Sequence, residues 1–245
     1  FEDSIIGDET VIKEDAIIKP GIKIWPDKII DEGAEVSTNL VWGSKFTKTI
    51  FGHRGIAGEI NVDITPEYAS KLGAAYGAIL KEGSKVGISC DDSSAAKMIK
   101  ISFISGLLSS GTEIFDFGNM LLPITRSAVR FYKADGGIHI STSTYDSTRL
   151  FIDFLDKNGC NIDRALERKI ESAFIREDFK RCEGECIKTV KTFSDYSQFY
   201  LRSIINGIKS EKIKYRISLN THSNFIAATL KQLLEQIGCE VEILN

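Results

Sequence analysis

The sequence lacks the long apolar run of a membrane-spanning helix, because no stretch approaches ~18–20 uninterrupted apolar residues. It also lacks a cysteine framework. Its 5 cysteines are odd in number and scattered, and the one close pair, Cys182 and Cys186, has no nearby histidine or second pair to complete a zinc site. These absences predict reduced thiols in a cytoplasmic protein without a membrane partner.

An excess of basic charge is missing as well. The chain has 31 Lys and Arg against 34 Asp and Glu, a formal net charge of −3, which argues against nucleic acid or an anionic membrane as a partner. With 42% hydrophobic residues it can bury a core, and 245 residues suit two modest domains. The chain begins at Phe1 without a charged-then-apolar leader, so we expect no signal peptide and expect both ends to be cuts in a longer protein.

Residues 6 to 41 repeat with a period of six. A β-branched residue recurs at the first position of each repeat: Ile6, Ile12, Ile18, Ile24, Ile30 and Val36. Three residues later stand mostly Gly, Asn or Asp, which tolerate a left-handed backbone in turns: Glu9, Asp15, Gly21, Asp27, Gly33 and Asn39. A period of six with an inward aliphatic side chain is typical of a β-solenoid, which we favour over an ordinary meander of strands.

This pattern resembles the hexapeptide repeats of left-handed β-helices, including the tails of sugar-phosphate nucleotidyltransferases. In that fold three hexads make one coil, so residues 1–46 hold about two coils. Each coil must bury its face on a neighbour. We therefore expect the solenoid to continue upstream or to be capped by a partner chain, and to join copies of the protein into a homo-oligomer.

After Phe46 the pattern changes to alternating strands and helices. Thr65 followed by Pro66 predicts a helix start, Asp92 or Ser93 the next start, and Gly111 its end. Strands are expected at 85–89, 113–118, 137–141, 150–156, 215–220 and 239–245, and helices at 66–80, 94–110, 125–133, 162–175 and 223–238. This order predicts a largely parallel sheet covered by helices on both faces, followed by half of a second domain.

Four segments after Thr49 resemble the phosphohexomutases, the family of phosphoglucomutases and phosphomannomutases. The first is "FGHRGIAG", followed after a spacer by "TPE", where the family has FGTDGIRG and LTPE. The second is "GLLSSGTEIFDFGNMLLP", and the third is "ADGGIHISTSTYDS", which stands at the place of the family's TASHNP loop. The fourth is "YRISLNTHSNFIAATLKQLLEQIGCEVEILN". The resemblance implies an α/β fold of three layers, α/β/α, with a mixed, mostly parallel sheet. It places domain I at 47–188 and part of domain II at 189–245, after a short left-handed parallel β-helix at 1–46.

The resemblance also assigns a catalytic position. The family's phosphate-carrying serine matches Ser143, which is retained. The histidine, asparagine and proline that follow it in the family are Thr144, Tyr145 and Asp146 here. A serine without an adjacent base is a poor nucleophile, so Ser143 is interpreted as a relic of the phosphoserine position.

Groups that would neutralise phosphate charge are lost as well. The opening motif's arginine position is Ala57, and Asp91 remains from the family's GRDTR segment without its flanking arginines. The family's magnesium-binding triple-aspartate loop has no counterpart in this sequence, so we expect no cofactor here and Mg²⁺ in the full-length parent. Phosphoryl transfer depends on positioning and charge neutralisation, and losing one stabilising group typically costs ~10²–10³-fold in rate. We therefore do not expect mutase turnover.

Binding of a hexose phosphate without chemistry stays open. Its candidate residues are Ser141, Thr142, Thr144, His53, Arg54 and Arg149. The structural alternative is that the hydroxyls of residues 141–144 only cap the strand and the turn after it. His139, in the middle of an apolar strand, is expected to be structural, whereas His222 follows a strand end where α/β folds often place functional loops.

Two functions therefore remain. Hexapeptide repeats joined to a mutase-like module resemble bacterial mannose-1-phosphate guanylyltransferases, in which a nucleotidyltransferase domain precedes the repeats. That resemblance implies a nucleotide-sugar synthesis protein with a degenerate phosphomannomutase/phosphoglucomutase-like module. The alternative is a non-catalytic regulatory or oligomerisation module that binds hexose phosphate weakly or not at all.

Overall fold

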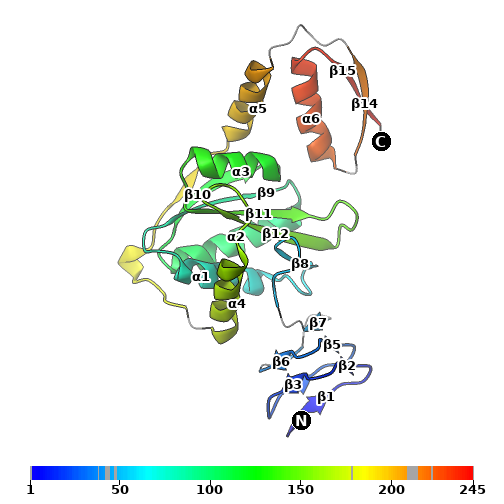
Figure 1. Cartoon of the computed structure of the whole chain (residues 1–245), viewed down its shortest axis with the longest axis vertical. Helices are drawn as coiled ribbons and strands as arrows, with labels where there is room; N and C mark the ends of the chain where they lie inside the picture. The colour runs from blue at the N-terminus through cyan, green and yellow to red at the C-terminus, as the bar shows by residue number, and fades with distance from the viewer. Residues whose placement is uncertain are drawn as a thin grey trace.

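The computed structural model describes residues 2–37, 39–41, 45–46, 49–177, 179–208, 215–221 and 223–244. Along the chain it has three parts: a stack of short strands, a six-stranded sheet with helices on both faces, and a small strand–helix–strand unit (Figure 1). The stack and the small unit lie at opposite ends of the molecule, with the large sheet between them. Within the described ranges, no helix combines the length and apolar character needed to cross a membrane.

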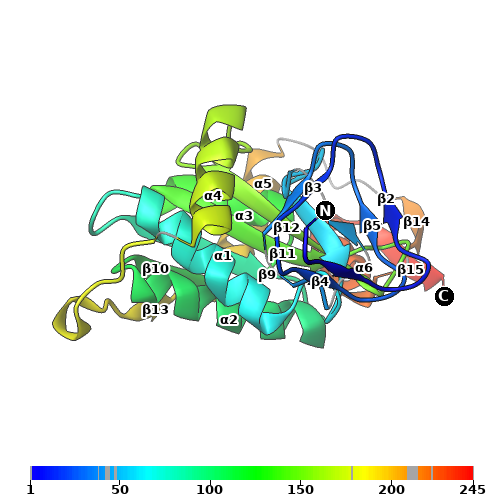
Figure 2. The same ribbon diagram turned by 90° about the horizontal axis from the view of Figure 1, so that it is seen from below.

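Two-residue strands that pair in parallel build the first part. They are β1 (Ile5–Ile6), β2 (Val11–Ile12), β3 (Ile17–Ile18), β4 (Lys23–Ile24), β5 (Ile29–Ile30), β6 (Glu35–Val36) and β7 (Lys45–Phe46). β1 pairs with β4, β2 with β5 and β3 with β6, so each strand lies on the strand three repeats later, and β7 adds to β5. The result is three narrow parallel ladders, seen from below in Figure 2.

Five of the predicted turn positions of the repeat are confirmed. Glu9, Asp15, Gly21, Asp27 and Gly33 have a left-handed backbone with φ between 55° and 78°. At the sixth position, the side-chain oxygen of Asn39 accepts a hydrogen bond from the Lys23 N–H at 2.8 Å. Inside the turns, the aliphatic side chains of Ile24, Ile30 and Val36 are buried. The period of six is therefore a real backbone period with an apolar interior.

The central sheet has the strand order β13-β10-β9-β11-β12-β8. Its strands are β8 (Ile56–Glu59), β9 (Lys85–Cys90), β10 (Glu113–Asn119), β11 (Gly136–Thr142), β12 (Arg149–Asp156) and β13 (Val190–Thr192). The strands β9, β10, β11 and β13 are parallel, whereas β12 runs antiparallel to both β11 and β8. The predicted mixed, mostly parallel sheet is thus confirmed. β12 reverses direction because only a short loop joins it to β11, and a parallel connection would need a crossover of a dozen or more residues.

Four helices flank this sheet: α1 (Pro66–Ile79), α2 (Ser94–Ser109), α3 (Leu122–Phe131) and α4 (Arg164–Arg176). The predicted starts of the first two are confirmed. Thr65 accepts from the Tyr68 N–H, and of the two candidates for α2 it is Ser93 that caps, accepting from the Ala96 N–H. α3 begins earlier than predicted because Pro123, with its fixed φ, suits the first helical turn.

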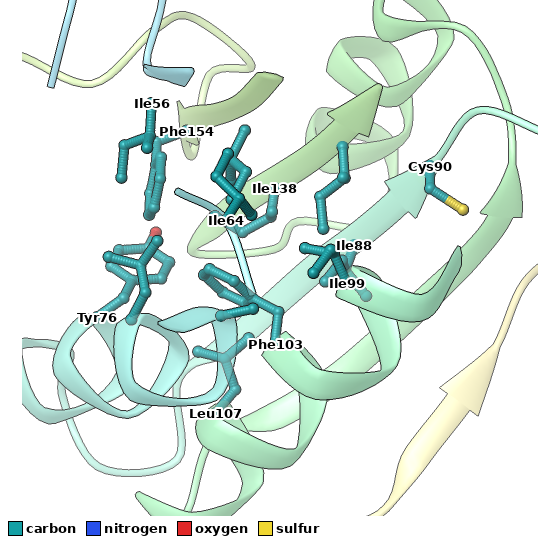
Figure 3. Packing of buried hydrophobic residues seen from close by; sticks show 14 of the residues in the cluster. Ile56, Ile64, Tyr76, Ile88, Cys90, Ile99, Phe103, Leu107, Ile138 and Phe154 are labelled. Atoms are coloured by element: carbon teal, nitrogen blue, oxygen red, sulfur yellow. The ribbon is translucent and has the colours of Figure 1, made fainter. Parts of the chain in front are cut away.

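The main core lies between the sheet and α1, α2 and α4, and a second core lies under α3 on the other face. Figure 3 shows Phe154 of β12 pointing at Tyr76 of α1 and Phe103 of α2, with ring centroids 5.3 and 6.0 Å away. α1 and α2 approach closely through Gly73 and Gly106. A Cβ on Gly106 would come within 2.0 Å of the Ser70 carbonyl oxygen, so only glycine fits there.

The sheet continues past the domain boundary expected after residue 188, because β13 pairs in parallel with β10. It follows a short 3₁₀ turn, η1 (Gly184–Cys186), and leads to α5 (Tyr196–Gly207), whose Tyr196 hydroxyl lies 2.8 Å from the Ser127 hydroxyl of α3. The last unit comprises β14 (Arg216–Asn220), α6 (Asn224–Gln236) and β15 (Glu240–Leu244), with β14 and β15 parallel. The segment that resembles domain II therefore begins with a strand of the first sheet.

Candidate functional site

Residues 141–148, here called the hydroxyl loop, form the tip of the β11–β12 hairpin. The Ser143 Oγ accepts from the N–H groups of Tyr145 and Asp146, both at 3.3 Å, and the Asp146 carboxylate accepts from the Thr148 N–H at 3.0 Å. The Ser143 N–H donates to the Arg149 carbonyl at 2.9 Å. Ser143 therefore caps the turn with the oxygen that would carry a phosphate, as the structural alternative predicts.

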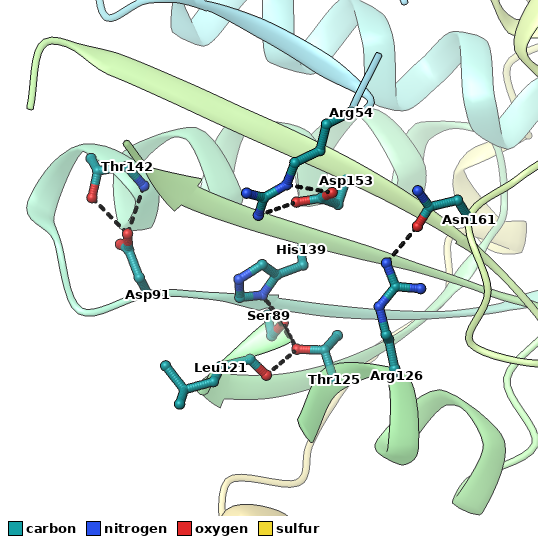
Figure 4. Close-up of polar contacts among 10 residues, drawn as sticks. All are labelled: Arg54, Ser89, Asp91, Leu121, Thr125, Arg126, His139, Thr142, Asp153 and Asn161. Atoms are coloured by element: carbon teal, nitrogen blue, oxygen red, sulfur yellow. Dashed lines mark hydrogen bonds and ion pairs between the residues drawn. The ribbon is translucent and has the colours of Figure 1, made fainter. Parts of the chain in front are cut away.

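Asp91 fastens the base of the hydroxyl loop to the start of α2. Its Oδ2 accepts from both the N–H and the hydroxyl of Thr142, at 2.6 and 2.7 Å (Figure 4). Its Oδ1 accepts from the Ser93 N–H at 3.0 Å. The N–H groups of Thr142, Ser143, Tyr145 and Asp146 are all taken within the chain. These four N–H groups therefore form no cradle for a phosphate, because the turn and Asp91 already use them.

Three of the candidate side chains are available to hydrogen-bond a ligand. Within the described part of the chain, no residue bonds to the side chains of Ser141, Thr144 or Arg149. Ser141 lies directly opposite Phe151 in the β11–β12 ladder, and Arg149 stands two residues before Phe151. Because side chains alternate along strands and opposite pairs share a face, these three lie on the face that α3 partly covers. Leu150 points into the core on the other face.

Arg54 reaches this same face from residues 49–55, which precede β8 and are here called the opening loop. The turn that contains Arg54 closes with a hydrogen bond from the Gly52 N–H to the Gly55 carbonyl, and Gly55 has φ +60° with no room for a Cβ beside the Ile152 carbonyl. The Arg54 guanidinium lies over the Phe151 ring, 5.1 Å from its centroid. It donates twice to Asp153 at 3.2 Å (Figure 4). The structure thus brings Arg54, Arg149, Ser141 and Phe151 together, and we call these four residues the arginine face.

The opening loop is itself anchored from α4. The Glu171 carboxylate accepts from the N–H groups of Ile50 and Phe51, at 2.9 and 3.1 Å. His53 lies at a small pit of about 20 Å³ between this loop and α4, which Asp153, Asn161 and Glu167 also line. Its volume suits about one water molecule rather than a sugar phosphate. His53 therefore borders the arginine face through Asp153, which lines the same pit and holds Arg54.

His139 is buried under α3 and is part of a hydroxyl network. Its Nδ1 lies 2.9 Å from the Ser89 hydroxyl and 3.3 Å from the Thr125 hydroxyl, and Thr125 donates to the Leu121 carbonyl (Figure 4). Burial lowers the pKa of His139 from 6.5 to about 4, opposed by the nearby Asp91 carboxylate. The imidazole is therefore neutral at pH 7 and joins β11, β9 and α3, as expected of a structural histidine.

Stability should therefore fall as the pH falls from about 6.5 toward 4. In this window the unfolded chain binds a proton at His139 that the folded chain does not, so stability is fully present above pH 6.5 and is lost by up to about 1.4 kcal/mol per pH unit below it. Urea unfolding at pH 7, 6 and 5 measures this, and His139→Gln should flatten the dependence. An unchanged slope in the variant would assign the loss to other groups.

The close cysteine pair and His222 are the remaining candidates from the sequence. In the described ranges, no three His, Cys, Asp or Glu side chains gather so as to hold a metal ion. Cys182 and Cys186 are free thiols beside the end of α2, where the Cys182 N–H donates to the Ser109 carbonyl at 2.9 Å. His222 lies outside the described residues.

Sequence reasoning did not find Asp153. It lies in an apolar run of β12, and only 2% of its side chain is exposed. A carboxylate buried this deeply is rarely left without a partner. An aspartate within an apolar strand is therefore the sequence signal that could have predicted a cation beside β12. Two polar contacts position the residues of the site. Asp153 binds the Arg54 guanidinium, and Asp91 accepts hydrogen bonds from Thr142.

The sequence of this chain is similar to one described family and to several known proteins. The sequence family described as phosphoglucomutase/phosphomannomutase, alpha/beta/alpha domain I, matches residues 48–181. A phosphoglucomutase/phosphomannomutase of Thermococcus kodakarensis is 34% identical over 203 residues, and a phosphoglucosamine/phosphogalactosamine mutase of Sulfurisphaera tokodaii is 30% identical over 200 residues. Each match covers 80% of this chain and 44% of the relative, so the chain spans less than half the length of these relatives.

Solved structures agree on the fold. A phosphoglucomutase/phosphomannomutase family protein from Burkholderia thailandensis superposes with a TM-score of 0.70 at 16% identity, covering 81% of this chain and 44% of that one. At this identity the likeness concerns the fold alone, and it includes the mostly parallel sheet described above. Taken with the family match over residues 48–181, it means that this chain belongs to the phosphoglucomutase/phosphomannomutase family, through its α/β/α domain I.

Proposed function

We propose that this chain is a hexose-phosphate-binding module of the phosphohexomutase type that does not transfer phosphate itself. The observation that carries the proposal is the arginine face, where two arginines and an unbonded hydroxyl share one face of the sheet around Phe151, next to the hydroxyl loop. Guanidinium groups suit phosphate oxygens because they offer several directed N–H donors. The family relatives are named as mutases of phosphorylated sugars, which makes a hexose phosphate the ligand of choice.

Loss of turnover is inferred from the state of Ser143. Its Oγ accepts two backbone hydrogen bonds, and the residue that follows it is Thr144 rather than an imidazole. A serine hydroxyl needs an adjacent base or another activating group to act as a nucleophile. Mg²⁺ would have to be held by parts of a longer parent protein, so no step of this proposal depends on it.

For residues 1–46 we propose a left-handed β-helix of hexapeptide type that joins copies of the protein. The proposal is supported by the three parallel ladders, in which strands three repeats apart pair, and by the left-handed turns. The combination with a mutase-type domain favours a parent active in nucleotide-sugar synthesis, with nucleotidyl transfer in another domain. Light scattering of this chain would test the association, and a monomer at all concentrations would contradict it.

A thermal-shift titration tests the binding proposal. Mannose 1-phosphate, glucose 1-phosphate and the hexose 6-phosphates, each with and without Mg²⁺, should raise Tm in a saturable way, because a ligand that binds only the folded state stabilises it by mass action. Unphosphorylated mannose is the control and should give no shift. A coupled assay for glucose 6-phosphate formed from glucose 1-phosphate should stay at background. A flat Tm up to millimolar ligand would refute binding, and measurable conversion would refute the loss of turnover.

A further inference from the structure

The Arg54 guanidinium is held along one edge only. Its Nε donates to the Asp153 Oδ1 and its Nη2 to the Asp153 Oδ2, each at 3.2 Å. This is the side-on arrangement of arginine with a carboxylate, and it uses two of the five N–H donors. The remaining three belong to Nη1 and Nη2. One N–H of each forms the end-on edge of the fork, which the Asp153 carboxylate does not contact.

The orientation of that free edge is fixed from two directions. Asp153 is a rigid anchor because it lies in the middle of β12 and only 2% of its side chain is exposed, whereas 52% of the Arg54 side chain remains exposed. The Phe151 ring lies under the guanidinium carbon at 5.1 Å and limits rotation of the plane. Little rotamer freedom is left to lose on binding, so a ligand meets a preorganised donor pair.

The surroundings of the free edge suit an oxyanion. Ser141 stands opposite Phe151 on one side and has no bonded partner in the described residues, so its hydroxyl can donate to a ligand. On the other side, Ala57 stands opposite Phe151. Ala57 occupies the place of arginine in the opening motif FGTDGIRG, whereas Arg54 occupies the place of aspartate. The arginine of this chain therefore stands three positions earlier in the sequence than the arginine of the motif. In space it still lies near Ala57, because both residues neighbour Phe151.

We propose that the Nη1–Nη2 edge of Arg54 is the receptor for the phosphate oxyanion of a hexose phosphate, with Ser141 as a second donor and Asp153 as the residue that positions the guanidinium. This inference rests on the proposed function and adds the recognition group. Because Asp153 already balances the charge of Arg54, recognition depends on the geometry of the donor fork more than on net charge. Lysine, which has no fork, cannot replace Arg54 in this role.

Isothermal titration with mannose 1-phosphate, inorganic phosphate and mannose tests this proposal on four proteins: the unchanged chain, Arg54→Lys, Arg54→Gln and the control Arg216→Gln. Arg216 is also an arginine in an ion pair, with Glu240 at 3.3 Å, but lies on β14. We expect Arg54→Lys to weaken binding of mannose 1-phosphate by about tenfold or more, although it keeps the charge. Arg54→Gln should abolish detectable binding, and Arg216→Gln should change nothing.

Folding is checked separately by urea unfolding without ligand, because Arg54→Gln leaves Asp153 buried without its cation. Arg54→Lys keeps a cation for Asp153 and decides the question if the glutamine variant does not fold. Equal binding by the unchanged chain and folded Arg54→Lys would overturn this proposal and leave the proposed function standing. No binding by the unchanged chain would overturn both. Inorganic phosphate binding as tightly as mannose 1-phosphate would retain Arg54 as the receptor but overturn recognition of the sugar ester.

Discussion

Replacing Phe154 by alanine is expected to lower the free energy of unfolding by about 3–5 kcal/mol, the usual cost of removing a fully buried ring from a close-packed core. The ring is only 2% exposed and makes edge-to-face contacts with Phe51, Tyr76 and Phe103 at centroid distances of 5.1 to 6.0 Å. These partners come from the opening loop, α1 and α2, so no single neighbour can move to fill the cavity. Urea unfolding followed by circular dichroism measures the loss.

The effect should extend to the arginine face, because Phe51 begins the loop that carries Arg54. Tyr145→Ala is a suitable control, since this ring is 94% exposed at the hairpin tip and its loss should cost less than about 0.5 kcal/mol. A similar loss of stability in both variants would mean that Phe154 does not hold the core together as described.

Asp91→Asn is expected to cost about 2–3 kcal/mol and to loosen the hydroxyl loop. The carboxylate accepts three hydrogen bonds, two from Thr142 and one from the Ser93 N–H. An amide offers one acceptor oxygen in place of two and turns a donor toward groups that donate, so at least one N–H loses its charged partner. Urea unfolding gives the free energy, and hydrogen exchange at the Thr142 amide should accelerate more than exchange in the core of β11.

The neighbouring Asp92 provides a matched control, because its side chain is exposed. Asp92→Asn makes the same chemical change one residue away and should leave both stability and Thr142 exchange nearly unchanged. If the two variants behaved alike, Asp91 would not fasten the loop, and the Thr142 contact would have little energetic weight.

Together these contacts explain why a loop with four consecutive hydroxyls need not be reactive. Thr142 is occupied by Asp91 and Ser143 by the turn that it caps. The hydrogen bonds that hold the loop in this conformation do not require a phosphate. In our proposal, phosphate recognition belongs to Arg54, which lies outside the hydroxyl loop.

Local signals in the sequence predicted the secondary structure well. Thr65 and Ser93 cap helices, and the hexad turns have the left-handed backbone that Gly and Asp tolerate. Such preferences involve a few neighbouring residues and leave a direct mark on the sequence. Side chains alternate along β11, so Ile138 and Ile140 lie in the main core and the structural His139 lies on the other face, beside Thr125 of α3. The family resemblance, which is confirmed for domain I, supplied the order of elements and the position of Ser143.

The tertiary structure decided the partners. Thr142 and Asp91 are 51 positions apart, and Arg54 and Asp153 are 99 positions apart. The local sequence around each of these residues therefore does not predict the contact. Sheet order brings β9, β11, β12 and the opening loop together, and β13 joins the same sheet across the boundary expected from sequence. A polar group either already has a hydrogen-bond partner within the chain or is available to a ligand. The folded structure decides this, because it sets the distances between segments that are far apart in the sequence. A sequence fixes the donors and acceptors it carries, but only the folded chain fixes which of them are already paired.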